Sequence, residues 1–387
     1  MASMTPFRSA PATGGQDRLA RIGHARQAVL YGDPLPAGTE PLVENWIERS
    51  WLRCLAQGHR PEQVPSFAMV SAAALRRTLE ANHQLVQAAR PVLEKLGQAI
   101  ADTRYFAILA NQAGVVINVN GPIDRRDWRA DMITRIGTDL SEQQVGTTAI
   151  GAALTELQPV WLHRGEHFFD ATSVYSCAGA PLFGPDGRCA GMLDLTGIEA
   201  AERPELKHLV AQSARSIENA LTLASPHALL VRLNWPGRTL GDESDGLVCV
   251  DADGGVTGAN QAARQMVSQL GHRSGAALHC NDLFAMPFEM LFDAAQRQAP
   301  VNGGVLEVPL WTGLRLHATA QLRGRGPLQV TPSLPPSATA SRTLKELETA
   351  LIHKAVSDAR GNVLQAARAL GVSRATVYRR LGSGKRS

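Results

Sequence analysis

The residue types near the C-terminal end of the chain are suited to contact a nucleic acid. Arginines, hydroxyls and an aromatic ring recur there at helical spacing, at Ser373, Arg374, Thr376, Tyr378, Arg379 and Arg380. Side chains of these kinds donate hydrogen bonds to phosphates and base edges. Residues 341–387 hold ten Lys or Arg against three Asp or Glu, although the whole chain has a net charge of only +4. We therefore expect double-stranded DNA to bind here, with a helical dimerisation tail that has a solvated basic face as the alternative.

The residues around this set predict a helix-turn-helix. Ala366, Ala367 and Leu370 give a first helix a small apolar face, and Gly371 suits the turn that follows. Ser373 then stands where the second helix needs an N-cap. An amphipathic helix precedes both, with apolar residues at i, i+3, i+4 and i+7 spacing: Leu344, Leu347, Leu351, Ile352 and Ala355. We expect a three-helix unit over 341–387, preceded by a Pro-rich linker at 326–340.

A second motif, His163-Arg164-Gly165-Glu166-His167, has the H-x-x-E-H pattern of some zinc peptidases. That chemistry needs both imidazoles on one face of a helix. Residues 159–163 predict a strand instead, and Gly165 weakens a helix, so the imidazoles need not converge. We expect no metal here: the two histidines either occupy structural polar positions or line a cavity.

Aromatic and polar residues cluster in sequence around this motif and could form the wall of a small-molecule site. Such sites are mostly apolar with a few oriented polar groups. The candidate ligand-binding residues are Trp161, His163, His167, Phe168, Tyr175 and Cys177. Ordinary core packing is the alternative for each of them. Asp194, on a predicted strand, is expected to be a satisfied structural carboxylate.

Length and composition bound the class of protein. The 387 residues, 44% hydrophobic and 19% charged, are typical of soluble globular material with room for roughly two to four domains. The five cysteines lack a C-x-x-C pair, which argues against a zinc knuckle or a disulfide framework. Residues 1–17 predict disorder, and we see neither a secretory signal nor a membrane span, so a cytoplasmic location is expected. No residues resemble a Ser/His/Asp or Cys/His catalytic set in a sequence context that would support one. We therefore expect neither an enzyme nor a cofactor.

The middle of the chain predicts an antiparallel sheet flanked by helices. Strands at 106–110 and 115–119 surround a turn, and a similar hairpin returns at 180–183 and 189–195. Between the hairpins we expect a helix over 142–157 and the strand at 159–163; a helix over 206–223 closes the unit. Upstream, helices are expected at 18–30, 43–55 and 75–100, with a break or kink at Pro91 that leaves a helix over 92–103.

A second α+β unit is predicted further on. Residues 246–263 give a strand, an Asp/Gly turn, another strand and a helix that opens at Asn260. An element at 282–284 and strands at 305–310 and 315–322 follow. The unit is either a second sensor-like module or a structural spacer.

Four stretches, 140–151, 163–168, 176–182 and 191–197, resemble the GAF domain of acetoin-catabolism-type regulators, and 48–54 resembles their N-terminal helix. Residues 246–263 and 282–284 resemble a PAS domain. Residues 361–379 resemble the Fis-type helix-turn-helix that closes many σ54 activators, a resemblance that implies DNA binding as a homodimer.

Together these observations predict an α+β multidomain chain. We expect a disordered N-terminus (1–17), an N-terminal helical region (18–90), a GAF sensor domain (91–225), a PAS-like domain (240–325), a linker (326–340) and a Fis-type unit (341–387).

The ATPase domain that regulators of this kind usually carry is not apparent, because the sequence has no G-x-x-x-x-G-K-[ST] motif. We expect a DNA-binding transcription regulator that senses a small metabolite or a partner and acts without ATP hydrolysis. Its expected partners are DNA, a second copy of the chain, and RNA polymerase or a full-length regulator, with no membrane. The alternative is a non-sensing truncated antagonist or interaction partner of full-length σ54-type activators.

Overall fold

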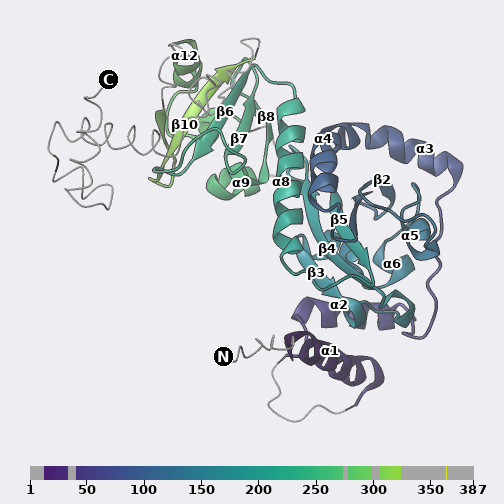
Figure 1. The fold of residues 1–387 in the computed structure, drawn as a ribbon. Helices are drawn as coiled ribbons and strands as arrows, with labels where there is room; N and C mark the ends of the chain where they lie inside the picture. The colour runs from purple at the N-terminus through teal and green to yellow at the C-terminus, as the bar shows by residue number, and fades with distance from the viewer. Residues whose placement is uncertain (1–12, 34–40, 273–277, 298–304, 324–362, 364–387) are drawn as a thin grey trace, which may run out of the picture. The chain divides into compact units, whose positions relative to one another are not determined.

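The computed structural model describes residues 13–33, 41–272, 278–297, 305–323 and Val363 (Figure 1). The chain divides into two compact units, 1–326 and 327–387. All but one residue of the second unit lie outside the described residues, and so do the linker and the three-helix unit predicted there. Within the first unit the described residues form twelve α-helices and two five-stranded antiparallel sheets. The predicted α+β class is thereby confirmed.

Four helices precede the first sheet: α1 (Thr13–Tyr31), α2 (Asn45–Ala56), α3 (Ala72–Ala81) and α4 (His83–Ala99). The predicted start of α1 at 18 was too late, because the helix already includes residues 13–17. Arg18, near this end, pairs with Glu166 at 2.9 Å and with Glu202 at 2.6 Å. These ion pairs to distant residues are not visible in the local pattern from which disorder to residue 17 was predicted.

Of the break or kink predicted at Pro91, the break does not occur. The helix α4 runs through Pro91, and the interruption lies at Asn82, between α3 and α4. The Asn82 side chain donates to the carbonyl of Thr78 at 2.8 Å, which ends α3 there. Pro91 has no backbone N–H to donate to the carbonyl of Gln87, four residues earlier. Because both residues are exposed, water can donate the missing hydrogen bond to that carbonyl. The domain boundary expected at 90/91 therefore falls inside a helix.

The first sheet has the order β2-β1-β5-β4-β3. Its strands are β1 (Tyr105–Asn111), β2 (Val116–Asn120), β3 (Val160–His163), β4 (Tyr175–Phe183) and β5 (Cys189–Ile198). Both predicted hairpins are confirmed, since β1 pairs with β2 and β4 with β5. In the first turn Gly114 adopts φ 80°, and the Asn111 side chain accepts from the backbone N–H groups of Ala113 and Val115.

The helix predicted over 142–157 is divided in two. The helix α6 (Glu142–Val145) ends at Gly146, whose φ of 65° leaves the helical region, and α7 (Ala149–Glu156) begins after it. Thr148 caps α7 by accepting from the N–H of Gly151. The apolar periodicity continues across the interruption because both helices bury their residues under the same face of the sheet.

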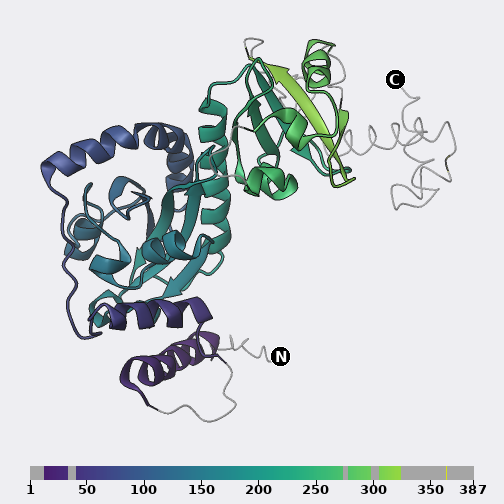
Figure 2. The ribbon, with the colours of Figure 1, turned by 180° about the vertical axis from the view of Figure 1, so that it is seen from behind.

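Each face of the first sheet has its own core. The helices α4 and α8 (Leu206–Ala224) pack on one face, as the two opposite views show (Figures 1 and 2). The other face is covered by α5 (Trp128–Ile133), α6, α7 and the short turns η1 (Arg164–Glu166) and η2 (Asp170–Thr172), with α2 contributing to the same core. Alternate residues of each strand therefore enter different cores.

The second sheet has the order β8-β7-β6-β10-β9. Its strands are β6 (Leu229–Asn234), β7 (Gly246–Val250), β8 (Val256–Ala259), β9 (Leu306–Pro309) and β10 (Arg315–Leu322). Four short helices accompany them: α9 (Gln261–Met266), α10 (Gln269–His272), α11 (Cys280–Leu283) and α12 (Glu289–Arg297).

The strand β6 was not predicted, although it lies in the middle of the second sheet between β7 and β10. The unit expected at 240–325 consequently starts too late. The helix start predicted at Asn260 is confirmed: its side-chain oxygen accepts from the N–H of Ala263 and from that of Leu247 on β7.

Candidate functional site

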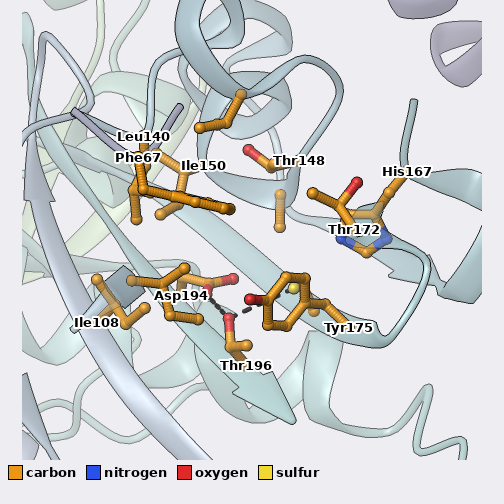
Figure 3. Close-up of a pocket in the computed structure, with 14 residues that line it drawn as sticks. Phe67, Ile108, Leu140, Thr148, Ile150, His167, Thr172, Tyr175, Asp194 and Thr196 are labelled. Atoms are coloured by element: carbon orange, nitrogen blue, oxygen red, sulfur yellow. Dashed lines mark hydrogen bonds between the residues drawn. The ribbon is translucent and has the colours of Figure 1, made fainter. Parts of the chain in front are cut away.

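A cavity lies between the first sheet and the helices and turns that cover it (Figure 3). Its volume is about 30 Å³. Strands β1, β4 and β5 supply one wall, and α5, α6, α7, η2 and the connecting segments supply the other. The lining residues are Phe67, Ile108, Ile133, Leu140, Val145, Thr148, Ala149, Ile150, His167, Thr172, Tyr175, Cys177, Asp194 and Thr196. The wall is thus mostly apolar, with a few polar groups, as is usual for small-molecule sites.

His167 lines this cavity and has one unpaired ring nitrogen among the described residues. Its side chain is buried, and its Nδ1 lies 2.9 Å from the carbonyl oxygen of Arg164. A carbonyl can only accept, so Nδ1 carries the hydrogen. Burial lowers the pKa of the imidazole to about 4, which leaves the ring neutral at pH 7. Nε2 is then a hydrogen-bond acceptor, and it has no partner among the described residues.

Asp194 supplies a second unpaired atom. It is 1% exposed, and its Oδ2 accepts a hydrogen bond from the Thr196 hydroxyl. Its Oδ1 has no partner within the described part of the chain. Burial raises the pKa of the carboxyl to about 7. The expectation that Asp194 is a fully satisfied structural carboxylate is therefore wrong, because the strand that buries it brings a partner to only one of its oxygens.

The other polar groups of the cavity are already engaged. The Tyr175 hydroxyl donates to the carbonyl of Arg129 at 3.2 Å, and the Thr172 hydroxyl donates to that of Phe169 at 2.8 Å. The Cys177 sulfur lies 3.3 Å from the Thr196 hydroxyl, and burial raises the pKa of this thiol well above its ordinary value, so it is a neutral thiol at pH 7. These groups give the wall its shape, whereas His167 and Asp194 keep hydrogen-bonding capacity.

The segment that carries His167 is held by the N-terminal helices. Arg26 of α1 donates to the carbonyls of Gly165, His167 and Phe168. The indole N–H of Trp51 on α2 donates to the carbonyl of Glu166 at 2.9 Å.

The Glu166 carboxylate fixes the start of the same segment. It accepts from the backbone N–H of His163, while Arg18 supplies its counter-charge. The position of the imidazole therefore depends on residues more than a hundred positions away in sequence.

Three of the six predicted ligand-binding residues, His167, Tyr175 and Cys177, line the cavity. Trp161 and His163 do not. Trp161 belongs to the core under α4 and α8. The His163 ring stacks on the Trp161 ring, with centroids 6.3 Å apart, and its Nδ1 is hydrogen-bonded to the Ser176 hydroxyl. Phe168 packs edge-to-face on Phe169, with ring centroids 5.0 Å apart, in the core next to the cavity.

Sequence reasoning missed several lining residues. The sequence contained a signal for Asp194 and Thr196, because these two polar residues alternate with leucines on a predicted strand. Ile108, which pairs with Asp194 across β1 and β5, follows from the same alternation. Phe67 lies in a segment without helix or strand, and its sequence neighbourhood gave no signal.

The H-x-x-E-H motif does not form a metal site in the described part of the chain. His163 ends β3, and the following residues form the short turn η1 rather than an α-helix. Its two imidazoles face different surroundings, and no group of three or more His, Cys, Asp or Glu able to hold a metal ion occurs among the described residues. The same residues include no helix long and apolar enough to cross a bilayer.

The predicted DNA-binding residues Ser373, Arg374, Thr376, Tyr378, Arg379 and Arg380 lie outside the described residues. Their region nevertheless has a clear relationship to known proteins. Residues 343–382 match the family model described as "Bacterial regulatory protein, Fis family", and residues 49–219 match "MimR, N-terminal domain".

Several curated relatives of the chain are transcription regulators. The acetoin catabolism regulatory protein of Cupriavidus necator is 30% identical over 261 residues, which cover 64% of this chain and 37% of the relative. The acetoin dehydrogenase operon transcriptional activator AcoR of Bacillus subtilis is 29% identical over 187 residues, covering 48% of this chain and 31% of the relative. The chain thus spans about a third of the length of the curated relatives it matches.

Among solved structures, the E. coli DhaR(N)–DhaL complex aligns with 71% of this chain and 98% of that chain. The sequence identity is 16% and the TM-score is 0.44.

Proposed function

The chain is homologous to the acetoin-catabolism-type regulators, and on that premise we propose that it is itself a transcription regulator. In this proposal residues 343–382 bind operator DNA. The regulator responds to a small molecule bound in the cavity of the first sheet. The relatives' names support the regulatory role. The observation that carries the sensing role is the cavity with two unpaired buried acceptors, at His167 and Asp194.

DNA binding is assigned to the basic face of the predicted second helix. Arg374, Arg379 and Arg380 are the proposed phosphate or base contacts, with Ser373, Thr376 and Tyr378 beside them. The resemblance to the Fis-type unit supports binding as a homodimer, for which a palindromic operator is the matching target.

The sensing unit is assigned to a GAF-type domain built on the first sheet, and the second sheet to a PAS-like domain that relays the signal or contributes to dimerisation. Regulation without ATP hydrolysis is part of this proposal, because residues 323–342, between β10 and the Fis-family match, leave no room there for an ATPase domain. The regulator then acts by occupying DNA, and so recruits or blocks polymerase.

The test of DNA binding uses the full chain and sheared genomic DNA from the source bacterium. Wild-type protein should retain a small set of fragments that share a palindromic sequence, and the Arg374→Ala, Arg379→Ala double variant should lose them. Arg76→Ala, Arg77→Ala is the matched control, since these two arginines lie on α3, outside the region proposed to bind DNA. Equal retention by both variants would contradict the assignment.

The antagonist alternative predicts a different response. A protein that only competes with full-length regulators would bind the same DNA, but its affinity would not change with any ligand. Titrating the retained fragment in the presence and absence of a cavity ligand separates the two.

A further inference from the structure

A second and larger space lies between α8, α9 and the end of β4, and we call it the α8–α9 cleft. Its volume is about 500 Å³, which is in the usual range for small-molecule sites. It shares no lining residue with the cavity that contains His167. Ala180 and Ala214, which line the cleft, belong to the core on the opposite face of the first sheet. The cleft is therefore a separate site from that cavity.

Hydrogen bonds hold the walls of the α8–α9 cleft together. The Arg264 guanidinium of α9 donates to the carbonyl of Pro185 at 2.7 Å. The backbone N–H of Ala259 donates to the same carbonyl at 2.9 Å. The Asn260 amide, at the start of α9, donates to Oδ1 of Asn219 on α8 at 2.7 Å. Because the elements on both sides are in direct contact, the space between them has a defined size.

The Glu218 carboxylate of α8 lines this cleft without a counter-charge. Glu218 is 6% exposed, and its Oε1 accepts from the backbone N–H of Phe183 at 2.9 Å. Among the described residues this carboxylate has no other hydrogen bond and no ion pair. Burial raises the pKa of Glu218 to about 7, so the group is mostly ionised at pH 8. Since buried charges are ordinarily paired, the carboxylate favours an occupant with a positive charge.

Arg215 lines the same cleft, three residues before Glu218 on α8. Side chains at this spacing lie on one side of a helix and can meet. The two residues nevertheless form no ion pair, and the exposed Arg215 has neither a hydrogen bond nor an ion pair in the described part of the chain. The cleft thus offers an unpaired anion that is buried and an unpaired cation that is exposed.

Much of the remaining wall is apolar. Leu157, Pro181 and Met266 are among the apolar lining residues, and Leu157 is 49% exposed. An occupant with an apolar group would remove this surface from water. Gln261 and Gln265 of α9 also line the cleft, and their side-chain amides can both donate and accept hydrogen bonds.

We propose that the α8–α9 cleft binds a free α-amino acid with an apolar side chain. Its ammonium group pairs with Glu218, its carboxylate pairs with Arg215, and its side chain packs on the apolar wall. A ligand with a single charge leaves one of the two residues unpaired, whereas a zwitterion pairs with both. This site lies beyond the proposed function, which places its ligand in the cavity of the first sheet. Water alone is the competing occupant.

Calorimetric titration of the full chain at pH 8 tests the ligand class. The amino acids are leucine, methionine and phenylalanine, and we expect saturable binding of at least one of them. Each is compared with the amine that lacks its carboxylate and with the acid that lacks its amino group. For leucine these are 3-methylbutylamine and 4-methylpentanoate. Both analogues, and glycine, which has no apolar side chain, should bind at least tenfold more weakly than the amino acid.

Methyl NMR with labelled methionines locates the bound amino acid. Met266 lines the α8–α9 cleft, whereas Met192 lies in the core on the other face of the first sheet. We expect a saturable shift of the Met266 methyl resonance with the amino acid and no shift of the Met192 resonance.

Variants separate the two charged contacts. Arg215→Gln, at an exposed position, should weaken amino-acid binding at least tenfold without weakening the binding of the amine analogue. Glu218→Gln keeps an oxygen for the Phe183 N–H but removes the negative charge, and should weaken the binding of both. Lys207→Gln is the matched control, because Lys207 is a cation on the same helix that does not line the cleft, and affinity should stay within about twofold. If Glu218→Gln does not fold, the comparison of Arg215→Gln with Lys207→Gln carries the test.

The absence of saturable binding by all three amino acids, which is the result expected for water alone, would overturn the proposal. Equal binding of an amino acid and either of its single-charge analogues would also overturn it, and so would equal losses in Arg215→Gln and Lys207→Gln. A shift at Met192 without one at Met266 would place the amino acid outside the cleft. Retention of genomic DNA fragments is measured separately, so each of these failures leaves the proposed DNA binding standing.

Discussion

The Arg26 guanidinium of α1 donates a 2.6 Å hydrogen bond to the carbonyl oxygen of His167, a residue 141 positions later in the chain. The same guanidinium donates to the carbonyls of Gly165 and Phe168 and pairs with Asp170. It also lies over the ring of Trp51, 5.8 Å from its centroid. One side chain of the N-terminal helix thus fixes the backbone on both sides of the imidazole that faces the cavity.

Replacing Arg26 by Ala should loosen this segment. Four acceptors lose a charged donor in a site where the Arg26 side chain is only 11% exposed. Hydrogen bonds to charged groups contribute about 1.5–3 kcal/mol each at most, and water can replace part of them, so we expect a loss of about 2 kcal/mol in the free energy of unfolding. Urea denaturation measures the loss, and hydrogen exchange should show faster exchange across residues 163–170.

The matched control for Arg26 is Arg21, on the same helix. Arg21 is exposed, and among the described residues it makes a single hydrogen bond, of 3.5 Å, to the carbonyl of Leu42. Arg21→Ala should leave both the urea midpoint and the exchange of residues 163–170 unchanged. Similar losses in the two variants would mean that Arg26 acts through net charge and not through the carbonyls that it contacts.

Gly146 should not tolerate a side chain. Its φ is 65°, and a Cβ there would meet the Phe169 ring at 2.9 Å and the Phe168 Cβ at 3.1 Å. Gly146→Ala combines backbone strain with a clash in the core, and we expect a loss of about 2–4 kcal/mol in the free energy of unfolding.

Gly23 gives the opposite result in a matched experiment. It lies inside α1, with no atom within 4 Å of a Cβ built on it. Gly23→Ala should stabilise the protein by about 0.5–1 kcal/mol, because alanine has the higher helix propensity. Thermal unfolding of the two variants beside the wild type measures both effects, and a Gly146→Ala variant as stable as the wild type would contradict the described geometry.

The buried carboxyl of Asp194 should give stability a distinct pH dependence. Burial raises its pKa from 3.8 to about 7, so the folded state binds the proton more tightly than the unfolded state does. Its contribution is greatest below pH 4 and is lost as the pH rises towards 7. The difference in unfolding free energy, Asp194→Asn minus wild type, should therefore increase from pH 5 to pH 8, by on the order of a few kcal/mol.

Other groups titrate in the same pH range, but their contributions are common to both proteins and cancel in the difference in unfolding free energy. Burial raises the pKa of Glu218 to about 7, which acts in the same direction. Burial lowers the pKa of His163 and of His167 to about 4, so stability from them rises between pH 4 and 6.5. All three are present in both proteins. Parallel pH profiles for wild type and Asp194→Asn would show that Asp194 titrates normally.

Salt dependence tests the proposed phosphate contacts. Each lost phosphate contact should lower the slope of log K against log salt concentration by about 0.9. Arg380→Ala should therefore weaken binding to specific and unrelated DNA alike and reduce the slope, as measured by fluorescence anisotropy at several salt concentrations. A change in affinity confined to the specific sequence would instead place Arg380 at a base edge.

Local patterns were sufficient for the hairpins of the first sheet and for the start of α9. A Gly114 turn between two apolar strands, and an asparagine at the N-cap of a short helix, depend on interactions within a few residues. They were insufficient at Pro91 and at Gly146. A proline within a helix is tolerated when that face of the helix is exposed. A glycine within an apolar periodic stretch can end a helix. Both outcomes depend on neighbours distant in sequence.

The residues of the cavity, too, were determined partly by local sequence and partly by the tertiary structure. The sequence alone determined the residue types near residues 161–177, the alternation of the strands, and the match of residues 343–382 to the Fis family. The tertiary structure decided which of these residues share a wall. His167, Tyr175 and Cys177 meet Asp194 there, while Trp161 and His163 face the other core, because pleating sends alternate side chains of a strand to opposite faces. Whether the oxygens of Asp194 find partners was likewise decided in three dimensions, since only the neighbouring elements could provide them.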